Sequence, residues 1–272
     1  MPSRTVLTTG ANSGIGLATV LELARRGYRS VGSVRSEAKA EEVERAAADA
    51  GLQVETALLD VTDAGACASV VDELAPWGLV NNAGYSVTGA IEDVGDDEAR
   101  HAIETMVVAP ARLARLALPH MRDQGGGRIV NVSSIMGLTT TPLTGWYQAC
   151  KHALEGLSDA LRMEVAQDGV RVSLIEPGGF KTGIWEEAEK EVARRAGSRY
   201  ESAYRRSMDG ARLVQVVMGD PAQVAKVITR ALGSRSPRAR YLVGYDAQGI
   251  ALAQRFTPTV IKDTVTRMVL GL

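Results

Sequence analysis

The sequence predicts an α/β fold in which a doubly wound parallel sheet of about seven strands carries helices on both faces. Short apolar runs alternate with helical stripes along almost the whole chain. The strand-like runs are short and apolar, which is typical of parallel strands covered on both faces. A glycine-rich turn follows the first of them directly. Right-handed crossovers then place a ligand crevice at the C-terminal ends of the strands.

The first half of the chain pairs each strand-like run with a helix. The first strand ends at Gly10, and the next helix has an apolar stripe at helical spacing and closes at Gly27. The second helix is rich in alanine and ends at Gly51. The expected strands in this half are residues 6–9, 30–34, 54–59 and 77–81, and the expected helices are 15–26, 38–50, 64–74 and 96–121.

The second half begins at a turn of three glycines, residues 125–127. The expected strands here are residues 128–133, 170–176 and 241–244, and the expected helices are 147–167 and 224–232. Between Pro177 and Pro221 the chain is rich in charge and has no predicted strand. We expect a single domain over residues 1–272, with a substrate lid inserted at about 179–220. Helices simply packed on the core are an equal alternative for individual residues there.

Composition excludes several classes of function. The formal net charge is −1 and the basic residues are scattered, so we expect no nucleic-acid partner. The three histidines have no ligand spacing, so we expect no metal site. The two cysteines lie far apart, which suits a reducing compartment. We expect no signal peptide and no stretch that spans a bilayer, and we expect a cytoplasmic protein.

The glycine-rich turn between the first strand and the first helix is a candidate phosphate-binding site. Gly10 permits a tight turn, while Gly14 and Gly16 let the backbone approach a pyrophosphate. The helix start supplies free N–H groups and the positive end of a dipole. Alone, such a turn is a weak signal, since it can merely connect two elements. The candidate cofactor-binding residues here are Gly10, Asn12, Ser13, Gly14, Ile15 and Gly16.

Two side chains after the second and third strands bear on which nucleotide binds. A carboxylate ending the second strand would accept from the ribose hydroxyls and repel a 2′-phosphate, but Val34 cannot do this. Arg35 offers a planar fork suited to phosphate, so we expect NADP(H), with NAD possible. A solvated surface arginine is the alternative. Asp60, followed by Val61, could accept from the adenine amino group or cap the helix that starts near Asp63.

A hydroxyl and an amine define the candidate catalytic site. Tyr147 and Lys151 are one helical turn apart, so both face the same way. The adjacent ammonium should lower the pKa of the Tyr147 phenol, which makes Tyr147 a plausible acid or base toward a carbonyl or alcohol. Ser134, after the fifth strand, can donate a hydrogen bond to the same oxygen. The backbone of Asn82, Ala83 and Gly84 would lie against the nicotinamide-side ribose.

In combination, these motifs resemble the short-chain dehydrogenase/reductase family over nearly the whole chain. The matching segments are Thr9 to Gly16, Asn81 to Gly84, Asn131 to Ser134, Tyr147 with Lys151, and Pro177-Gly178 followed by Thr182. The resemblance implies a Rossmann fold, a nicotinamide cofactor and reversible alcohol/ketone oxidoreduction. It also implies that Ser134 positions the substrate oxygen and Tyr147 exchanges its proton. Lys151 would bind the nicotinamide ribose, and Pro177, Gly178 and Thr182 would contact the nicotinamide end.

The sequence departs from this family at Met106, where many members place an asparagine on the long fourth helix. In the family that residue supports a water that links the lysine to solvent, and methionine has no side-chain donor. Pro110 lacks the N–H that would bond the Met106 carbonyl, so that carbonyl could hold a water instead. A mere kink at Pro110 is the equal alternative. Turnover is therefore in question, and a cofactor-binding protein with weak or no turnover is the alternative function.

The substrate and the partners are less well defined by the sequence. Residues 135–139, Trp146 and Trp185 suggest an apolar pocket, so we expect an apolar ketone or alcohol. Arginines in the predicted lid could clamp a carboxylate; they are Arg194, Arg195 and Arg199. The amphipathic tail, residues 256–272, could touch a membrane surface, but we expect it to pack on its own domain or a subunit partner. The family resemblance implies a homodimer or homotetramer, paired through residues 102–118 and 147–161.

Overall fold

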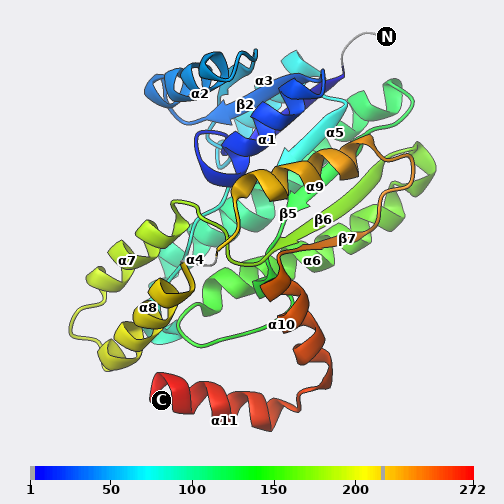
Figure 1. Ribbon diagram of the computed structural model, residues 1–272. Coiled ribbons are helices and arrows are strands. Elements are labelled where there is room, and N and C mark those ends of the chain that lie inside the picture. Colours follow the sequence, from blue (N-terminus) through cyan, green and yellow to red (C-terminus); the bar gives the residue numbers. More distant parts are fainter. Residues whose placement is uncertain (1–3, 216–217) are drawn as a thin grey trace.

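The computed structural model describes residues 4–215 and 218–272, and these contain one seven-stranded parallel sheet (Figure 1). The strand order is β3-β2-β1-β4-β5-β6-β7, so the order reverses between β1 and β4. The predicted doubly wound α/β fold is therefore confirmed. The strands are β1 (Thr5–Thr9), β2 (Arg29–Val34), β3 (Glu55–Leu58), β4 (Gly78–Asn81), β5 (Arg128–Val132), β6 (Arg171–Pro177) and β7 (Arg240–Val243).

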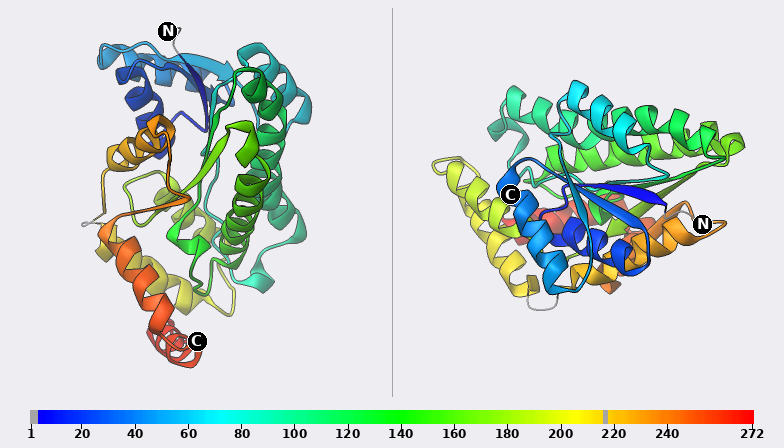
Figure 2. Two further views of the ribbon diagram at one scale, coloured as in Figure 1. Left: turned by 90° about the vertical axis from the view of Figure 1, so that its right-hand side faces the viewer. Right: turned by 90° about the horizontal axis from the view of Figure 1, so that it is seen from above.

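Six helices cover the two faces of the sheet (Figure 2). One face carries α1 (Gly14–Arg25), α2 (Glu37–Asp49) and α9 (Pro221–Gly233), and the other carries α3 (Ala64–Leu74), α5 (Ala109–Asp123) and α6 (Gly145–Glu164). Aspartates start two of them: Asp63 accepts from the backbone of α3, and Asp220 accepts from that of α9, where Pro221 follows. Buried aliphatic side chains fill both interfaces with the sheet.

The long helix predicted over residues 96–121 is interrupted in the structure. It consists of α4 (Asp96–Ile103), a π-helical turn η2 (Glu104–Val108) and α5. The N–H of Ala109 donates to the carbonyl of Glu104, five residues earlier. Pro110 explains the interruption, because its ring nitrogen cannot donate the bond that would continue an α-helix. The prediction of one continuous helix was therefore wrong at this turn.

The remaining elements gather at the C-terminal edge of the sheet or connect strands to helices (Figure 1). The helices α7 (Ile184–Arg194) and α8 (Glu201–Gln215) lie within the predicted lid, of which residues 216–217 are outside the described part of the chain. Two further helices end the chain, α10 (Tyr245–Phe256) and α11 (Thr259–Leu270). Three short 3-10 turns complete the set: η1 (Ile91–Asp93), η3 (Ile135–Gly137) and η4 (Ala166–Asp168).

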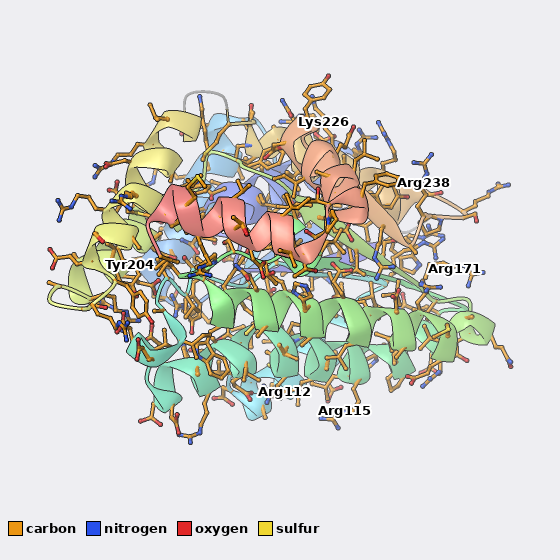
Figure 3. All side chains as sticks on the ribbon, turned by 90° about the horizontal axis from the view of Figure 1, so that it is seen from below. Arg112, Arg115, Arg171, Tyr204, Lys226 and Arg238 are labelled. Carbon is orange, nitrogen blue, oxygen red and sulfur yellow. The ribbon has the colours of Figure 1, made fainter. Side chains whose placement is uncertain are left out.

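The tail helix α11 lies across the outside of the molecule and packs beside α8 (Figure 3). None of its residues is buried. Its apolar side chains remain exposed, among them Val260, Val265, Met268 and Val269. Packing on its own domain therefore covers only part of this helix. In the described part of the chain, no helix has both the length and the apolar character needed to cross a bilayer.

Candidate active site

The predicted site residues lie along one edge of the sheet, where the parallel strands end. The glycine turn follows β1, Arg35 follows β2 and Asp60 comes shortly after β3. Asn82 follows β4, Ser134 comes just after β5, and Pro177 is the last residue of β6. Helix α6 brings Tyr147 and Lys151 to the same edge. Val61 is the exception, because its side chain is buried in the hydrophobic core.

The glycine turn brings the start of α1 against the end of β1. Gly10 and Gly14 have φ angles of +65° and +52°, a conformation that favours glycine. A Cβ at Gly16 would lie only 2.1 Å from the carbonyl oxygen of Gly10, so no larger residue fits there. Ser13 precedes the helix, and its exposed hydroxyl makes no capping bond to it. The free N–H groups of this helix start are therefore left for an anion.

Side-chain hydrogen bonds join the ends of β1 and β4 below this turn. The Asn82 amide donates to the carbonyls of Thr9 (2.9 Å) and Gly10 (3.1 Å). In return, the Thr9 hydroxyl accepts from the backbone N–H groups of Asn82 (3.0 Å) and Ala83 (2.9 Å). We call residues 9–16 and 82–84 together the glycine cradle. Its shape depends on backbone and small side chains, which suits close approach of a nucleotide backbone.

The rim of the cradle carries one basic and one acidic residue. Arg35 and Asp60 are both exposed, and the Arg35 charge helps to lower the pKa of the Asp60 carboxyl. The larger causes are hydrogen bonds from the backbone (2.9 Å) and hydroxyl (2.7 Å) of Thr62. Asp60 thus forms a local turn with Thr62 and does not cap α3. That alternative was wrong, because Asp63 is closer to the helix start and supplies the cap.

The loop after β6 contacts the cradle and the start of α10. A Cβ at Gly14 would lie 3.0 Å from Cγ2 of Thr182, so this threonine lies beside the start of α1. The Gly179 N–H donates to a carboxylate oxygen of Asp246 at 2.6 Å. A Cβ at Gly178 would lie 2.2 Å from the same oxygen. The sequence reasoning did not single out Asp246, which gives the loop a charged neighbour.

Ser134, Tyr147 and Lys151 meet where β5 ends and α6 begins. Ser134 and Lys151 are only 9% and 5% exposed. Ser134 starts the turn η3, and its hydroxyl accepts from the Met136 N–H at 3.1 Å. The Lys151 ammonium donates to the Val132 carbonyl at 2.9 Å and lies 5.6 Å from the centre of the Tyr147 ring. The three side chains therefore lie together, with Ser134 and Lys151 buried and Tyr147 partly buried.

Burial sets the ionisation of this pair. Burial of the ammonium lowers the pKa of Lys151 to about 8. Burial raises the pKa of the Tyr147 phenol, and a hydrogen bond with Ser134 opposes part of this rise. The sequence had predicted that Lys151 would lower the tyrosine pKa. The structure differs because burial dominates at Tyr147 and because the ammonium is held by the Val132 carbonyl.

Met106 makes the neighbouring side of the site apolar. It lies in the π-helical turn η2, is 1% exposed and packs with Val87, Ala102 and Cys150 against the partly buried Tyr147. A Cβ at Gly84 would lie 3.4 Å from both Cγ and Sδ of Met106. The Met106 side chain therefore fills the space between Gly84, at the end of the cradle, and the backbone of η2. It offers no polar atom on the helix side where the family places an asparagine.

Side chains from distant parts of the chain fix α7 and α8, which we call the α7–α8 wall. Glu191 accepts from the Thr88 N–H at 2.6 Å. Arg195 donates to the Asp93 carbonyl at 3.0 Å and forms an ion pair with Glu98. The hydroxyl of Tyr204, a residue of α8 labelled in Figure 3, donates to the Asp93 carboxylate at 2.7 Å and accepts from the Ala90 N–H at 2.6 Å. Arg195 is thus committed to structural partners, while Arg194 and Arg199 are exposed.

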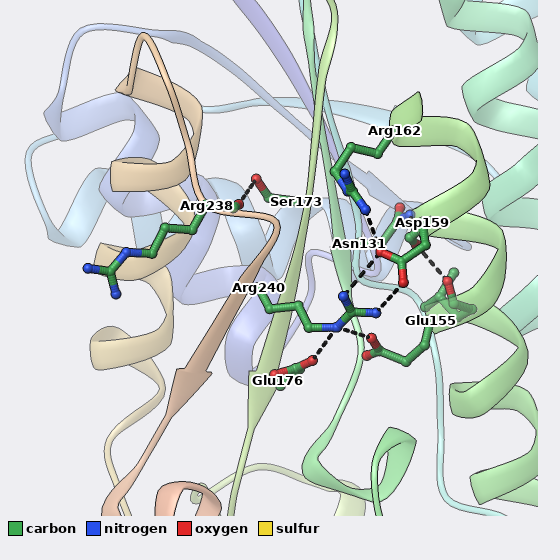
Figure 4. A network of polar contacts seen from close by, with 10 residues as sticks. Asn131, Glu155, Asp159, Arg162, Ser173, Glu176, Arg238 and Arg240 are labelled. Carbon is green, nitrogen blue, oxygen red and sulfur yellow. Dashed lines mark hydrogen bonds and ion pairs between the residues drawn. The ribbon is translucent and has the colours of Figure 1, made fainter. Parts of the chain in front are cut away.

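The sequence reasoning also missed a group of acidic residues beneath the site (Figure 4). Glu155 on α6 and Glu176 on β6 are 6% and 1% exposed, and both approach Arg240 on β7. Asn131 on β5 lies nearby and donates to the Ser158 hydroxyl at 2.8 Å. The available signal was Glu176 itself, because an acidic residue near the end of an otherwise apolar strand needs a buried partner.

Comparison with known proteins settles the family. A family model for short chain dehydrogenases matches residues 4–193. The chain belongs to this family. Rat retinol dehydrogenase 7 is 33% identical over 281 residues, covering 96% of this chain and 86% of the relative. An uncharacterized oxidoreductase of Bacillus subtilis, YusZ, is 36% identical over 265 residues, covering 94% and 93%. The chain is therefore an NAD(P)-dependent oxidoreductase that acts on CH–OH groups.

Solved structures of the family agree with the fold. A short-chain dehydrogenase from Streptomyces avermitilis is 30% identical with a TM-score of 0.80, covering 99% of this chain and 97% of that chain. A variant of actinorhodin polyketide ketoreductase with NADPH is 25% identical with a TM-score of 0.78, covering 92% and 97%. A short-chain dehydrogenase/reductase from Burkholderia phymatum in complex with NAD is 25% identical with a TM-score of 0.81, covering 96% and 95%. Members of the family thus bind either nucleotide.

Proposed function

We propose that this protein uses NADP(H) to interconvert a ketone and a secondary alcohol on an apolar small molecule, with Tyr147 as the acid/base. The observation that carries the proposal is the convergence of the buried Ser134 and Lys151 and the partly buried Tyr147 at the sheet edge that also carries the glycine cradle. These residues come from the end of β5 and from α6. A hydroxyl donor, a phenol and an amine so placed suit proton exchange with a carbonyl oxygen.

The glycine cradle fits a dinucleotide. The absence of a Cβ at Gly16 and Gly10 lets the start of α1 pack directly against the ends of β1 and β4, so that its free N–H groups can face a pyrophosphate. The uncapped Ser13 hydroxyl adds a donor at that point. Asn12, Ile15, Ala83, Gly84, Pro177 and Thr182 would line the rest of its path. When bound, the nicotinamide cofactor supplies a hydride to the substrate carbon or accepts one from it.

The protein side chains then handle the proton. In the reducing direction, Ser134 donates a hydrogen bond to the substrate carbonyl oxygen, and Tyr147 transfers its phenolic proton to that oxygen. A raised pKa suits this role, because it keeps the phenol protonated at neutral pH. The buried Lys151 ammonium, with its lowered pKa, stands ready to return a proton toward the phenolate. Oxidation of an alcohol runs through the same groups in reverse.

The proposed preference for NADP(H) rests on Arg35. It is exposed at the end of β2, where Val34 leaves no carboxylate to repel a 2′-phosphate. We expect NADPH to bind about tenfold more tightly than NADH. Arg35→Ala should remove most of that difference. Arg45→Ala, an exposed arginine on the adjacent helix α2, is the matched control and should leave it unchanged. Tighter binding of NADH by the parent protein would contradict the preference.

The proposed substrate is apolar because the side chains near the catalytic residues are apolar. Ile135 is buried, while Met136, Leu138, Trp146 and Trp185 are partly exposed. The similar proteins include a retinol dehydrogenase and a polyketide ketoreductase, which supports a hydrophobic alcohol or ketone. We further propose that residues 179–220 form the substrate lid. Arg195 does not serve as a carboxylate clamp there, since it pairs with Glu98.

The deciding experiment measures NADPH consumption against a panel of apolar ketones. The parent protein should turn over at least one of them, and Tyr147→Phe should reduce kcat about a hundredfold or more. The Tyr147→Phe variant should still bind NADPH, as measured by fluorescence, which would show that it is folded. Undiminished turnover in Tyr147→Phe would overturn the assigned role of Tyr147.

A second candidate is a protein that binds the cofactor with weak or no turnover, and the apolar Met106 favours it. Under this alternative, Met106→Asn would show clear NADPH consumption where the parent shows almost none. Comparable rates in the two proteins would favour the oxidoreductase.

We also propose a homodimer or homotetramer paired along α5 and α6. The apolar Leu157 and Met163 on α6 are exposed, at 43% and 65%. Size-exclusion chromatography with light scattering tests this, and a monomer at micromolar concentration would contradict it.

A further inference from the structure

Two buried carboxyl groups share one arginine between α6, β6 and β7 (Figure 4). Arg240 Nε lies 3.0 Å from a carboxylate oxygen of Glu155 and 3.2 Å from one of Glu176. The other two nitrogens of this guanidinium bond both oxygens of Asp159, at 3.1 and 2.7 Å. Arg162 also pairs with Asp159 at the outer end of the group. The single Nε–H of Arg240 therefore donates to Glu155, while Glu176 lies only within ion-pair distance of it.

The carboxylate oxygens of Glu155 and Glu176 have too few hydrogen-bond donors, and one added proton would supply a donor. Among the described residues, neither oxygen of Glu176 has a hydrogen-bond partner, and Oε1 of Glu155 has none. Two adjacent buried carboxylates repel each other, and one proton shared between them removes the repulsion and supplies the missing donor. Burial and the charge of Glu155 accordingly raise the pKa of Glu176 to about 7, while Arg240 opposes the rise.

Charged groups near the Glu155–Glu176 pair come from the elements packed around it. Helix α6 contributes Lys151, Asp159 and Arg162, and β7 contributes Arg240. At the start of α10, Asp246 lies farther along, against Gly179. Arg240 already forms two bonds with Asp159, so its charge does not neutralise three carboxyl groups at once. One of the glutamates is therefore the natural place for a proton at neutral pH.

The pair extends toward the catalytic lysine. Glu155 follows Lys151 by one turn of α6, and its charge raises the pKa of the lysine against the effect of burial. The Ser133 hydroxyl lies close by, because a Cβ at Gly137 would be 2.8 Å from Ser133 Oγ and 3.2 Å from Glu155 Oε1. Ser133 Oγ also lacks a partner among the described residues. Ser133 directly follows Val132, whose carbonyl accepts from Lys151.

We propose that Glu155 and Glu176 hold one shared proton and, with Ser133, form a proton store that serves Lys151. This inference rests on the proposed function. During reduction, Tyr147 gives a proton to the substrate oxygen, and the Lys151 ammonium returns one toward the phenolate. The acid form of the glutamate pair then reprotonates the neutral lysine amine. The pair recovers its proton from solvent at Arg240, which is 35% exposed on its side chain. During alcohol oxidation each transfer is reversed.

The proposed proton store explains how Lys151 can be reprotonated although Met106, in η2, is apolar. Met106 and Cys150 supply no charged or hydroxyl group on that side. Among the described residues, buried polar atoms without partners occur on both sides: on Thr105, Tyr85 and Trp146 near η2, and on Ser133, Glu155 and Glu176 on the other side. The second group includes two buried carboxyl groups, so the route through α6, β6 and β7 offers groups that can hold and release a proton.

The first test compares Glu176→Gln and Glu155→Gln with Glu164→Gln. Glu164 is an exposed glutamate near the end of the same helix, so its substitution controls for loss of a carboxylate. We expect each buried variant to lower kcat for ketone reduction about tenfold with little change in KM. The solvent deuterium isotope effect on kcat should rise, because proton return to Lys151 becomes limiting. Glu164→Gln should match the parent in both respects. An unchanged kcat and isotope effect in both buried variants would overturn the proposal.

A second measurement does not depend on turnover. Infrared difference spectra recorded across neutral pH should show a protonated carboxyl band in the parent that disappears in Glu176→Gln or Glu155→Gln. Absence of that band from the folded parent would overturn the shared proton. If the parent reduced no ketone but showed the band, the proposed function would fail while the shared proton stood. NADPH binding and thermal unfolding confirm that each variant is folded.

Discussion

The glycine cradle and the α7–α8 wall lie at the same edge of the sheet but are held in opposite ways. The cradle is built from backbone and small residues in two short segments, and Asn82 and Thr9 join these segments through four hydrogen bonds. The wall is held by side chains that reach across about a hundred positions, such as Arg195 to Glu98. One region depends on steric fit of the backbone, and the other depends on buried polar contacts.

The difference matters for what each region can tolerate. A cradle that leaves no space for a Cβ excludes almost every substitution at Gly16, whereas a wall held by several separate contacts can lose one of them and keep its place. The cradle would therefore preserve cofactor binding strictly. If the wall forms the proposed substrate lid, side chains outside these contacts can vary while the contacts hold its position.

The largest expected effect is at the cradle. Gly16→Ala should weaken NADPH binding about a hundredfold or more, because the new Cβ would lie 2.1 Å from the Gly10 carbonyl oxygen and force α1 away. Gly156→Ala on α6 is the matched control, since nothing lies within 4 Å of its added Cβ. Fluorescence titration with NADPH measures both. Equal affinities in the two variants would show that the cradle tolerates movement of α1.

The next expected effect is a pH dependence of stability. The glycine cradle contains no acidic residue, whereas Glu176 is buried beneath the candidate active site. Its pKa is about 7 when folded, against an ordinary value of 4.5. Between about pH 4.5 and pH 7, Glu176 is therefore protonated in the folded protein and ionised in the unfolded chain. The stability from Glu176 is complete below about pH 4.5 and is lost as pH rises through about 7, by roughly 3 kcal/mol.

Urea unfolding of the parent and of Glu176→Gln at a series of pH values measures this loss. The free energy of unfolding of the parent, relative to the variant, should fall as pH rises through about 7. A constant difference between the two proteins across that range would contradict the assignment of the proton to this pair.

A smaller effect is expected at the wall. Tyr204→Phe removes the hydroxyl that joins Asp93 and the Ala90 N–H, so it should lower the free energy of unfolding by about 1–3 kcal/mol. NADPH affinity should stay within about twofold, because the cradle does not contact this residue. Tyr245→Phe, at a tyrosine that is 95% exposed, is the control. A loss of NADPH affinity in Tyr204→Phe would mean that wall and cradle are coupled.

The smallest effect is expected from the tail. Removal of residues 258–272 should change the free energy of unfolding by no more than about 1 kcal/mol, because α11 has no buried residue. Its side-chain bond from Lys262 to Thr140 lies at the surface. Urea unfolding of the shortened chain measures the change. A loss of several kcal/mol would show that α11 braces the wall through its packing on α8.

Much of the fold could be predicted because its signals are local. Strand–helix alternation and the glycine turn lie within short windows, and the spacing of Tyr147 and Lys151 follows directly from helix geometry. The π-helical turn could not be located in the same way. Pro110 marks a missing donor, but whether the helix kinks, binds water or widens depends on packing around Met106.

Contacts between distant residues escaped the sequence reasoning. Arg195 looked like a candidate clamp for a substrate, but in the folded chain it pairs with the Glu98 carboxylate and donates to the Asp93 carbonyl, both about a hundred positions away. Asp60 was considered as a cap for the helix that starts near Asp63, but the structure shows that Asp63 itself accepts from the first turn of α3. The pairing of Glu155 and Glu176 with Arg240 likewise requires the order of β6 and β7, which no local pattern encodes.

The reversal of strand order between β1 and β4 has a consequence for how this chain folds during synthesis. The β1–β2–β3 half can form once its own residues have emerged, but the free side of β1 waits for β4, whose register pairs Val6 with Gly78. Until then, a strand that ends up central exposes its backbone along one side. The interval between the first half and the arrival of β4 is therefore when this protein most needs a chaperone.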